Sequence, residues 1–264
     1  MLFSDRPREH YPNSQLREVI CQLRFPTILT INNVEPADFQ EMIRNEFPQY
    51  IRKEESPAPR ISGFGTPNAR LEPQSPITNY HFVSADGFWK LNLTRDFISL
   101  ATLKYSGWET FARHLDQALA SFIQLYKPAY FQRVGLRYIN AFSRRQLGLE
   151  TVSFSELFSP SYLGPLVEPD VQEECVLNSG CDFLLKLDNS CQGKIHAGPG
   201  RIKATASQTA QDPEIKFIFD MDLSMNGNIP CTLAAAGLET LHGHGTRIFE
   251  GAITDTLRRA STSI

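Results

Sequence analysis

Four side chains that could hold a ligand lie close together in the stretch QRVGLRYINAF (132–142): Arg133, Arg137, Tyr138 and Asn140. The planar guanidinium of arginine donates paired hydrogen bonds to carboxylate, phosphate or carbonyl groups. Tyrosine would pack against such a ligand, and asparagine would fix the backbone. The apolar residues between them predict a β-strand. Arg137 therefore has two interpretations, a ligand contact in a concave sheet face or a structural ion pair on the sheet surface.

A second strand is expected to bring further polar side chains to the same place. The stretch REVICQLRF (17–25) alternates between apolar and polar residues, which indicates a half-buried strand. If the chain holds two similar halves, the first strands of the halves lie near their pseudo-axis, and Glu18 and Gln22 approach Arg133 and Arg137. The predicted binding residues are Arg137, Tyr138, Asn140, Arg133, Glu18, Gln22 and Arg24.

A pair of carboxylates suggests a different chemistry. Asp220 and Asp222 stand two apart on a predicted strand, so both point to one face and could hold Mg²⁺ or Mn²⁺ for phosphoryl chemistry. The alternative is the solvated polar side of an amphipathic strand. No other metal site or cofactor is expected. His242 and His244 diverge on a helix, and the cysteines lack the close pairing of a structural zinc site.

Composition excludes several classes of protein. The 264 residues carry a net charge of −3, which argues against general electrostatic attraction to nucleic acid or anionic membranes. No apolar run is long enough to span a membrane, and the N-terminus lacks the pattern of a signal peptide. The five irregularly spaced cysteines are typical of free thiols, so a cytoplasmic protein is expected.

Hydrophobic periodicity predicts the main elements. Helices are expected at 36–47, at 108–126 before Pro128, and from about 232 to 259 with a middle weakened by Gly243 and Gly245. Strands are expected within 79–105, with a turn at 85–87, and later around turns at 189–190 and 198–200 and along 214–225. Residues 55–79 contain five prolines and predict a long exposed loop.

The order of these elements repeats, which predicts an α+β fold in a single domain built of two pseudo-repeats. Residues 10–128 and 129–264 each run strand, helix, antiparallel meander and long helix. Short echoes such as WETF (108–111) and LETL (238–241) agree with a duplication. Two such halves would form one curved antiparallel sheet with the helices on one side. This plan is similar to TATA-binding-protein-like or helix-grip folds.

Three stretches together resemble an uncharacterised, sporadically distributed bacterial family. They are YPNSQLREVICQLRFP, RVGLRYIN and LETLHGHGTRIFEGAITDTLRR. The family shares a Gly-x-Arg-Tyr-x-Asn motif, matched here by Gly135, Arg137, Tyr138 and Asn140. The C-terminal match runs through Leu241, His242, Phe249, Ile253 and Thr254. The resemblance implies a bacterial setting, often a mobile element or a defence system, and it implies no known reaction.

The residues favour a non-catalytic binding or adaptor module that recognises a partner protein, a peptide or a small ligand, with self-association left open. The alternative is a metal-dependent enzyme acting on phosphate esters or nucleic acid through Asp220 and Asp222. Sequence-tolerant nucleic-acid binding by the sheet face is a third hypothesis, which the acidic net charge disfavours.

Overall fold

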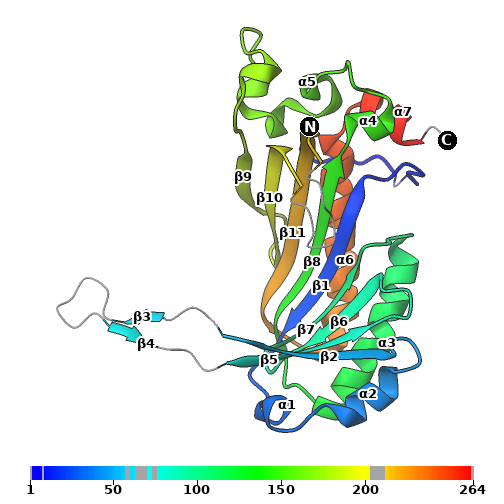
Figure 1. Ribbon diagram of the computed structural model, residues 1–264, viewed down its shortest axis with the longest axis vertical. Coiled ribbons are helices and arrows are strands. Elements are labelled where there is room, and N and C mark those ends of the chain that lie inside the picture. The colour runs from blue at the N-terminus through cyan, green and yellow to red at the C-terminus, as the bar shows by residue number, and fades with distance from the viewer. Residues whose placement is uncertain are drawn as a thin grey trace. The chain divides into compact units, whose positions relative to one another are not determined.

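Helices and strands are mixed along the chain in the computed structural model (Figure 1), as the predicted α+β class requires. Nine strands form one sheet in the order β2-β5-β6-β7-β1-β8-β11-β10-β9. The strand pairs whose register is described are antiparallel. The structure describes residues 2–7, 9–56, 60–62, 70–72, 76–202 and 212–262.

The chain divides into two compact units. The first comprises Met1–Ile20, Val134–Asn226 and Leu233–Ile264, and the second comprises Cys21–Arg133 and Gly227–Thr232. These bounds differ from the predicted halves 10–128 and 129–264, since the N-terminal residues group with the C-terminal part of the chain. The internal duplication and the likeness to TATA-binding-protein-like or helix-grip folds stay predictions.

The second unit contains a meander of strands and three helices. Its elements are α1 (Leu29–Asn33), α2 (Ala37–Ile43), β2 (Gln49–Glu55), β3 (Arg60–Ser62), β4 (Arg70–Glu72), β5 (Ile77–Val83), β6 (Trp89–Leu93), β7 (Phe97–Thr102) and α3 (Trp108–Tyr126). The turn between β5 and β6 is confirmed, with the backbone N–H of Gly87 donating to the carbonyl of Ser84. Gly87 adopts φ 75°, which favours glycine there.

Helix α3 confirms the predicted helix 108–126. Phe111, Leu115 and Phe122 recur at helical spacing and are buried. The ring of Phe122 packs against the ring of Phe25, with the two centroids 4.7 Å apart. The helix ends where Lys127 takes the left-handed conformation and Pro128 prevents continuation. None of the helices among the described residues combines the length and apolar character that crossing a membrane requires.

The first unit holds most of the residues with candidate chemistry. It contains α4 (Arg144–Leu147), α5 (Phe154–Leu157), short 3-10 helices within 160–175, β9 (Cys181–Lys186), β10 (Cys191–Gly200), α6 (Ala234–Ala252) and α7 (Asp255–Thr262). Three strands have residues in both units, namely β1 (Leu16–Arg24), β8 (Phe131–Phe142) and β11 (Lys216–Ile229).

Two glycines let α6 approach the strands of the first unit closely. A Cβ atom on Gly237 would lie 2.7 Å from Sδ of Met225 on β11. A Cβ atom on Gly245 would lie 3.0 Å from Cδ1 of Leu223 and 3.3 Å from Cε2 of Tyr138. The helix therefore packs on the face of β8 and β11 that carries Tyr138, Leu223 and Met225, of which the first two are buried.

The prediction of one continuous helix over 232–259 is wrong, because two helices, α6 and α7, occupy this segment. Gly243 and Gly245 lie inside a continuous α6, and the break falls at Ile253 and Thr254. There Ile253 forms an isolated β-bridge with Phe158, and the backbone N–H of Thr254 donates to the carbonyl of Leu157. A segment distant in sequence thus replaces the helical hydrogen bonds.

Two other local predictions need correction. The turn expected at 198–200 is instead the end of β10, where Gly198 pairs with Ile218 and Gly200 with Lys216. The Pro-rich loop at 55–79 includes the paired strands β3 and β4, and β5 begins at Ile77. Residues 57–59, 63–69 and 73–75 of that loop lie outside the described residues.

Candidate functional site

The central predicted residue, Arg137, points to the exposed face of β8 and contacts Asp220 of β11 at two points. Its Nε donates to Oδ1 of Asp220 at 2.8 Å, and its Nη2 donates to Oδ2. The arginine side chain is 44% exposed and the aspartate side chain 17%. The hydrogen bond to Asp220 raises the pKa of Arg137 against the opposing effect of burial, and Asp222 and Glu18 raise it further.

Neighbouring strands extend this pair into a row of charged and polar side chains. His196 on β10 lies opposite Asp220 on β11 and opposite Asp182 on β9. Its Nδ1 is 3.0 Å from Oδ1 of Asp182. Two residues along the same strands, Lys194 lies opposite Asp222. The outer face of the first unit therefore presents side chains of both charge signs, and opposite cross-strand neighbours such as Lys194 and Asp222 attract each other.

Tyr138 and Asn140 lie on the other face of β8, so the structure does not bring them together with Arg137. The hydroxyl of Tyr138 is 2.7 Å from Nδ1 of His242 on α6. Nδ2 of Asn140 donates to the carbonyl of Phe219 at 3.1 Å. Both side chains are buried. Strand alternation explains the separation, since consecutive residues point to opposite faces. Their contacts hold α6 and β11 in place.

The remaining predicted residues are divided between the units. Glu18 belongs to the first unit, where its charge acts on Arg137. Gln22, Arg24 and Arg133 belong to the second. Gln22 is partly exposed and Arg24 exposed, on the polar face of β1. Arg133 acts on the buried Cys21, where burial raises the pKa of the thiol and the arginine partly opposes that shift. That Gln22, Arg24 and Arg133 join Arg137 and Glu18 in one site stays a prediction.

The carboxylates of the alternative metal site share one face of β11, at partly exposed positions between buried neighbours. Both oxygens of Asp220 already accept hydrogen bonds from Arg137. A divalent ion held by Asp220 and Asp222 would have to displace that guanidinium. The bidentate pair therefore favours the ion-pair interpretation of Arg137 over a metal site at these positions.

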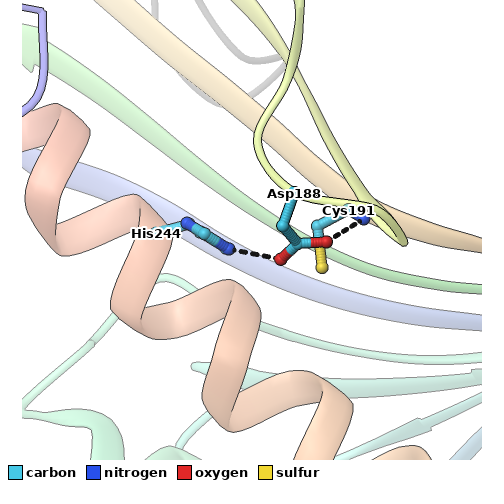
Figure 2. Close-up of side chains that lie close together, drawn as sticks. All are labelled: Asp188, Cys191 and His244. Atoms are coloured by element: carbon cyan, nitrogen blue, oxygen red, sulfur yellow. Dashed lines mark hydrogen bonds and ion pairs between the residues drawn. The ribbon is translucent and has the colours of Figure 1, made fainter.

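Three potential metal ligands that the sequence did not bring together meet elsewhere in the first unit (Figure 2). Asp188 and Cys191 flank the turn between β9 and β10, and His244 lies on α6. One ligand atom from each lies within 4.8 Å of the other two. Nε2 of His244 is 2.8 Å from Oδ2 of Asp188. Carboxylate, thiol and imidazole are all common ligands of zinc.

The turn itself holds Asp188 in position. Its Oδ1 accepts hydrogen bonds at 2.7 Å from the backbone N–H groups of Ser190 and Cys191. The bond from Ser190 is the main reason that the pKa of Asp188 lies well below its ordinary value, and the contact with His244 lowers it further. Burial raises the pKa of the Cys191 thiol to about 11. Without a metal ion, Asp188 is therefore ionised and Cys191 is protonated at neutral pH.

The only sequence signals for this group are an Asp-x-x-Cys spacing at a predicted turn and a histidine on a predicted helix. Asp188 and His244 are 56 residues apart in the chain. Periodicity predicts the hairpin and the helix, but it does not reveal which turn of the helix faces the hairpin. Sequence reasoning about single motifs therefore misses the grouping of these three residues.

A third polar cluster lies beside a cavity of about 570 Å³ that Phe3, Arg6, Asp255 and other residues line. Nη1 of Arg258 donates to the buried carboxylate of Glu250 and to the Tyr11 hydroxyl, which in turn donates to Glu250 at 2.7 Å. Arg6 donates to Asp255 at 2.7 Å.

The two arginines that line this cavity thus face carboxylates of the same chain. Burial and the bond to Glu250 raise the pKa of Tyr11. This network joins the N-terminal segment to α6 and α7, which is a structural role.

Comparison with protein-family models and with curated proteins finds no match for this chain. The resemblance to a sporadically distributed bacterial family therefore stays a prediction.

Proposed function

We propose that this chain is a non-catalytic binding or adaptor module that recognises a protein partner through the outer sheet face of its first unit, with Arg137 at the centre. The observation that carries the proposal is the state of that arginine. Its guanidinium is anchored at two points by Asp220, yet 44% of the side chain is exposed. An arginine fixed in this way loses little side-chain entropy on binding.

The N–H groups of Arg137 that Asp220 does not occupy determine which acceptor groups a partner must have. The contacts with Asp220 use Nε and Nη2, and Nη1 carries two more N–H donors. A partner carboxylate or backbone carbonyl fits them. The carboxylates of Glu18, Asp182 and Asp222 share the face, so a polyanion such as nucleic acid is disfavoured. A protein segment with charges of both signs is favoured.

The biological setting follows only from the resemblance described above. It implies a bacterial mobile element or defence system, in which an adaptor would link other proteins. This setting is part of the proposal.

The test compares companions of the wild-type protein with those of Arg137→Ala, each tagged, expressed in its own host and captured gently for native mass spectrometry. A stoichiometric protein companion is expected on the wild type. Loss of a central anchor costs about 2 kcal/mol or more, roughly 30-fold in Kd, so the variant should lose that companion.

The control is Arg113→Ala, which removes another exposed arginine from α3 of the second unit. It should retain the companion. Equal capture by wild type and Arg137→Ala would contradict the proposal, as would a wild-type protein that is always a bare monomer. A self-dimer that Arg137→Ala leaves intact would also contradict it.

A further inference from the structure

Asp188, Cys191 and His244 converge from two directions, as Figure 2 shows. The hairpin turn supplies the carboxylate and the thiol, and α6 supplies the imidazole. The three ligand atoms lie within 4.8 Å of one another. In a tetrahedral zinc site with bonds of roughly 2.0–2.3 Å, the ligand atoms lie about 3.3–3.8 Å apart. Small side-chain rotations therefore suffice to close these three atoms around one ion.

The hairpin presents its two ligands in a fixed arrangement. Asp188 and Cys191 are three residues apart, and Oδ1 of Asp188 accepts bonds from two backbone N–H groups of the turn. These bonds leave Oδ2 directed toward His244. Groups that orient a ligand before the metal arrives raise metal affinity, because less order has to be imposed on binding. The turn thus acts as the supporting shell of the site.

The helix reaches the hairpin because the residues around His244 are small. Gly245 is buried against Leu223 and Tyr138, where a larger side chain would hold α6 away from the strands. Gly193 on β10 likewise lies close to the same side chain, since a Cβ atom there would lie 3.0 Å from Cδ2 of Leu223. The close packing of β10, β11 and α6 around Leu223 brings His244 within hydrogen-bonding distance of Asp188.

We propose that Asp188, Cys191 and His244 form a zinc-binding site with three protein ligands and one water molecule. A thiolate with imidazole and carboxylate selects Zn²⁺ over Mg²⁺ or Ca²⁺, which prefer oxygen ligands alone. Three protein ligands leave a fourth, exchangeable position, the arrangement found where zinc acts as a Lewis acid. The Asp188 side chain is 36% exposed, so solvent reaches the ion.

Sγ of Cys191 releases its proton to solvent as the S–Zn bond forms, because the thiolate is the ligand. In a neutral His244 that donates from Nε2 to Asp188, the proton moves to Nδ1 so that Nε2 can bind the ion. Asp188 exchanges its contact with His244 for a bond to the ion. Binding therefore releases the proton of Cys191, and the affinity for the ion rises with pH.

This site is independent of the proposed binding face. Cys191 lies at a buried position of β10, whereas Lys194 and His196 lie at exposed positions of the same strand, on the face of Arg137. The metal site would therefore survive if the partner proposal were wrong, and the reverse also holds.

The experiment titrates the untagged, chelator-treated protein with Co²⁺ and then with Zn²⁺. One equivalent of Co²⁺ should produce a sulfur-to-cobalt charge-transfer band and intense tetrahedral d–d bands, and Zn²⁺ should abolish both. Calorimetry of Zn²⁺ binding in buffers of different ionisation enthalpy should report the released proton. Zn²⁺ should also raise the Tm of the wild type.

The variants Cys191→Ser, His244→Gln and Asp188→Asn each remove one ligand. Because loss of a supporting residue already weakens metal binding about 10–100-fold, loss of a ligand should weaken Zn²⁺ binding by at least about 100-fold. The control Cys175→Ser removes an exposed thiol and should bind as the wild type does. If one variant fails to fold, the other two carry the same test.

Three outcomes would overturn the site. The first is a wild type that gives no saturable charge-transfer band. The second is an unchanged band in Cys191→Ser, and the third is a loss of the band in Cys175→Ser, which would assign the metal to an exposed thiol.

Discussion

Replacing Gly243 or Gly245 of α6 by alanine should have opposite effects on stability. Gly243 and Gly245 stand two residues apart inside the same helix. A Cβ atom on Gly243 would meet nothing within 4 Å. One on Gly245 would lie 3.0 Å from Cδ1 of Leu223 and 3.3 Å from Cε2 of Tyr138. Both substitutions gain the same helix propensity, so the packing around each added methyl group determines the difference in stability between the two variants.

The magnitudes follow from these distances. Alanine in place of glycine in a helix interior contributes about 0.8–1.0 kcal/mol, and Gly243→Ala should realise most of it. At Gly245 the added methyl overpacks the core, which costs about 1–3 kcal/mol. Tyr138 has little freedom to move, because its hydroxyl bonds His242. We therefore expect Gly245→Ala to be less stable than Gly243→Ala by about 1–3 kcal/mol, or roughly 2–12 °C in Tm.

Urea unfolding followed by circular dichroism, with calorimetry beside it, measures both variants against the wild type. Hydrogen exchange of α6 shows whether the change is local to the helix. Gly243→Ala should lie above the wild type and Gly245→Ala below it. Equal stabilisation by both would refute the close packing of α6 on Leu223 and Tyr138. Destabilisation by Gly243→Ala would refute the open position of that residue.

Three further predictions follow from buried contacts and perturbed groups. Glu250→Ala leaves Arg258 buried without its main partner, so it should cost about 3–5 kcal/mol by urea unfolding, and Arg258→Met in addition should recover part of this loss. Tyr138→Phe removes the bond to His242 and should cost about 1 kcal/mol in the same assay while leaving partner capture unchanged. The pKa of Asp188 in the folded protein lies below its ordinary 3.8, so the contribution of Asp188 to the free energy of unfolding is present above pH 3.8 and is lost as the pH falls toward the folded pKa. The free energy of unfolding of Asp188→Asn should therefore fall less steeply with pH below 3.8 than that of the wild type.

The elements with regular periodicity could be predicted from the sequence. The alternation of REVICQLRF predicts β1, and the apolar stripe of WETFARHLDQALASFIQLY predicts α3 together with its end before Pro128. In these segments the buried face is encoded locally, and the fold uses that face. The hairpin turn before β6 was predictable for a similar reason, since Gly87 supplies its positive φ.

Elements formed by distant contacts could not be predicted in this way. Strand β2 has no buried residue, and it becomes a strand by pairing with β5. The break between α6 and α7 depends on Leu157 and Phe158, which precede it by about a hundred residues in the printed sequence. The local sequence reveals neither the pairing of β2 with β5 nor the contacts that end α6.

The candidate sites show the same division. Alternation correctly placed Arg137 and Asp220 on strand faces, but their pairing joins residues 83 positions apart. The sequence grouped Tyr138 and Asn140 with Arg137, although strict alternation separates them from it. The proposed metal ligands depend on which turn of α6 packs against the hairpin, and the local sequence does not encode that packing, which includes the close approach at Gly245.

The most direct test of the binding proposal is the affinity of Arg137→Lys for the companion captured with the wild type, measured in solution at fixed salt. Lysine keeps the positive charge and loses the planar fork that Asp220 anchors. A weakening of at least about tenfold is predicted. An affinity equal to that of the wild type would contradict recognition by an anchored arginine.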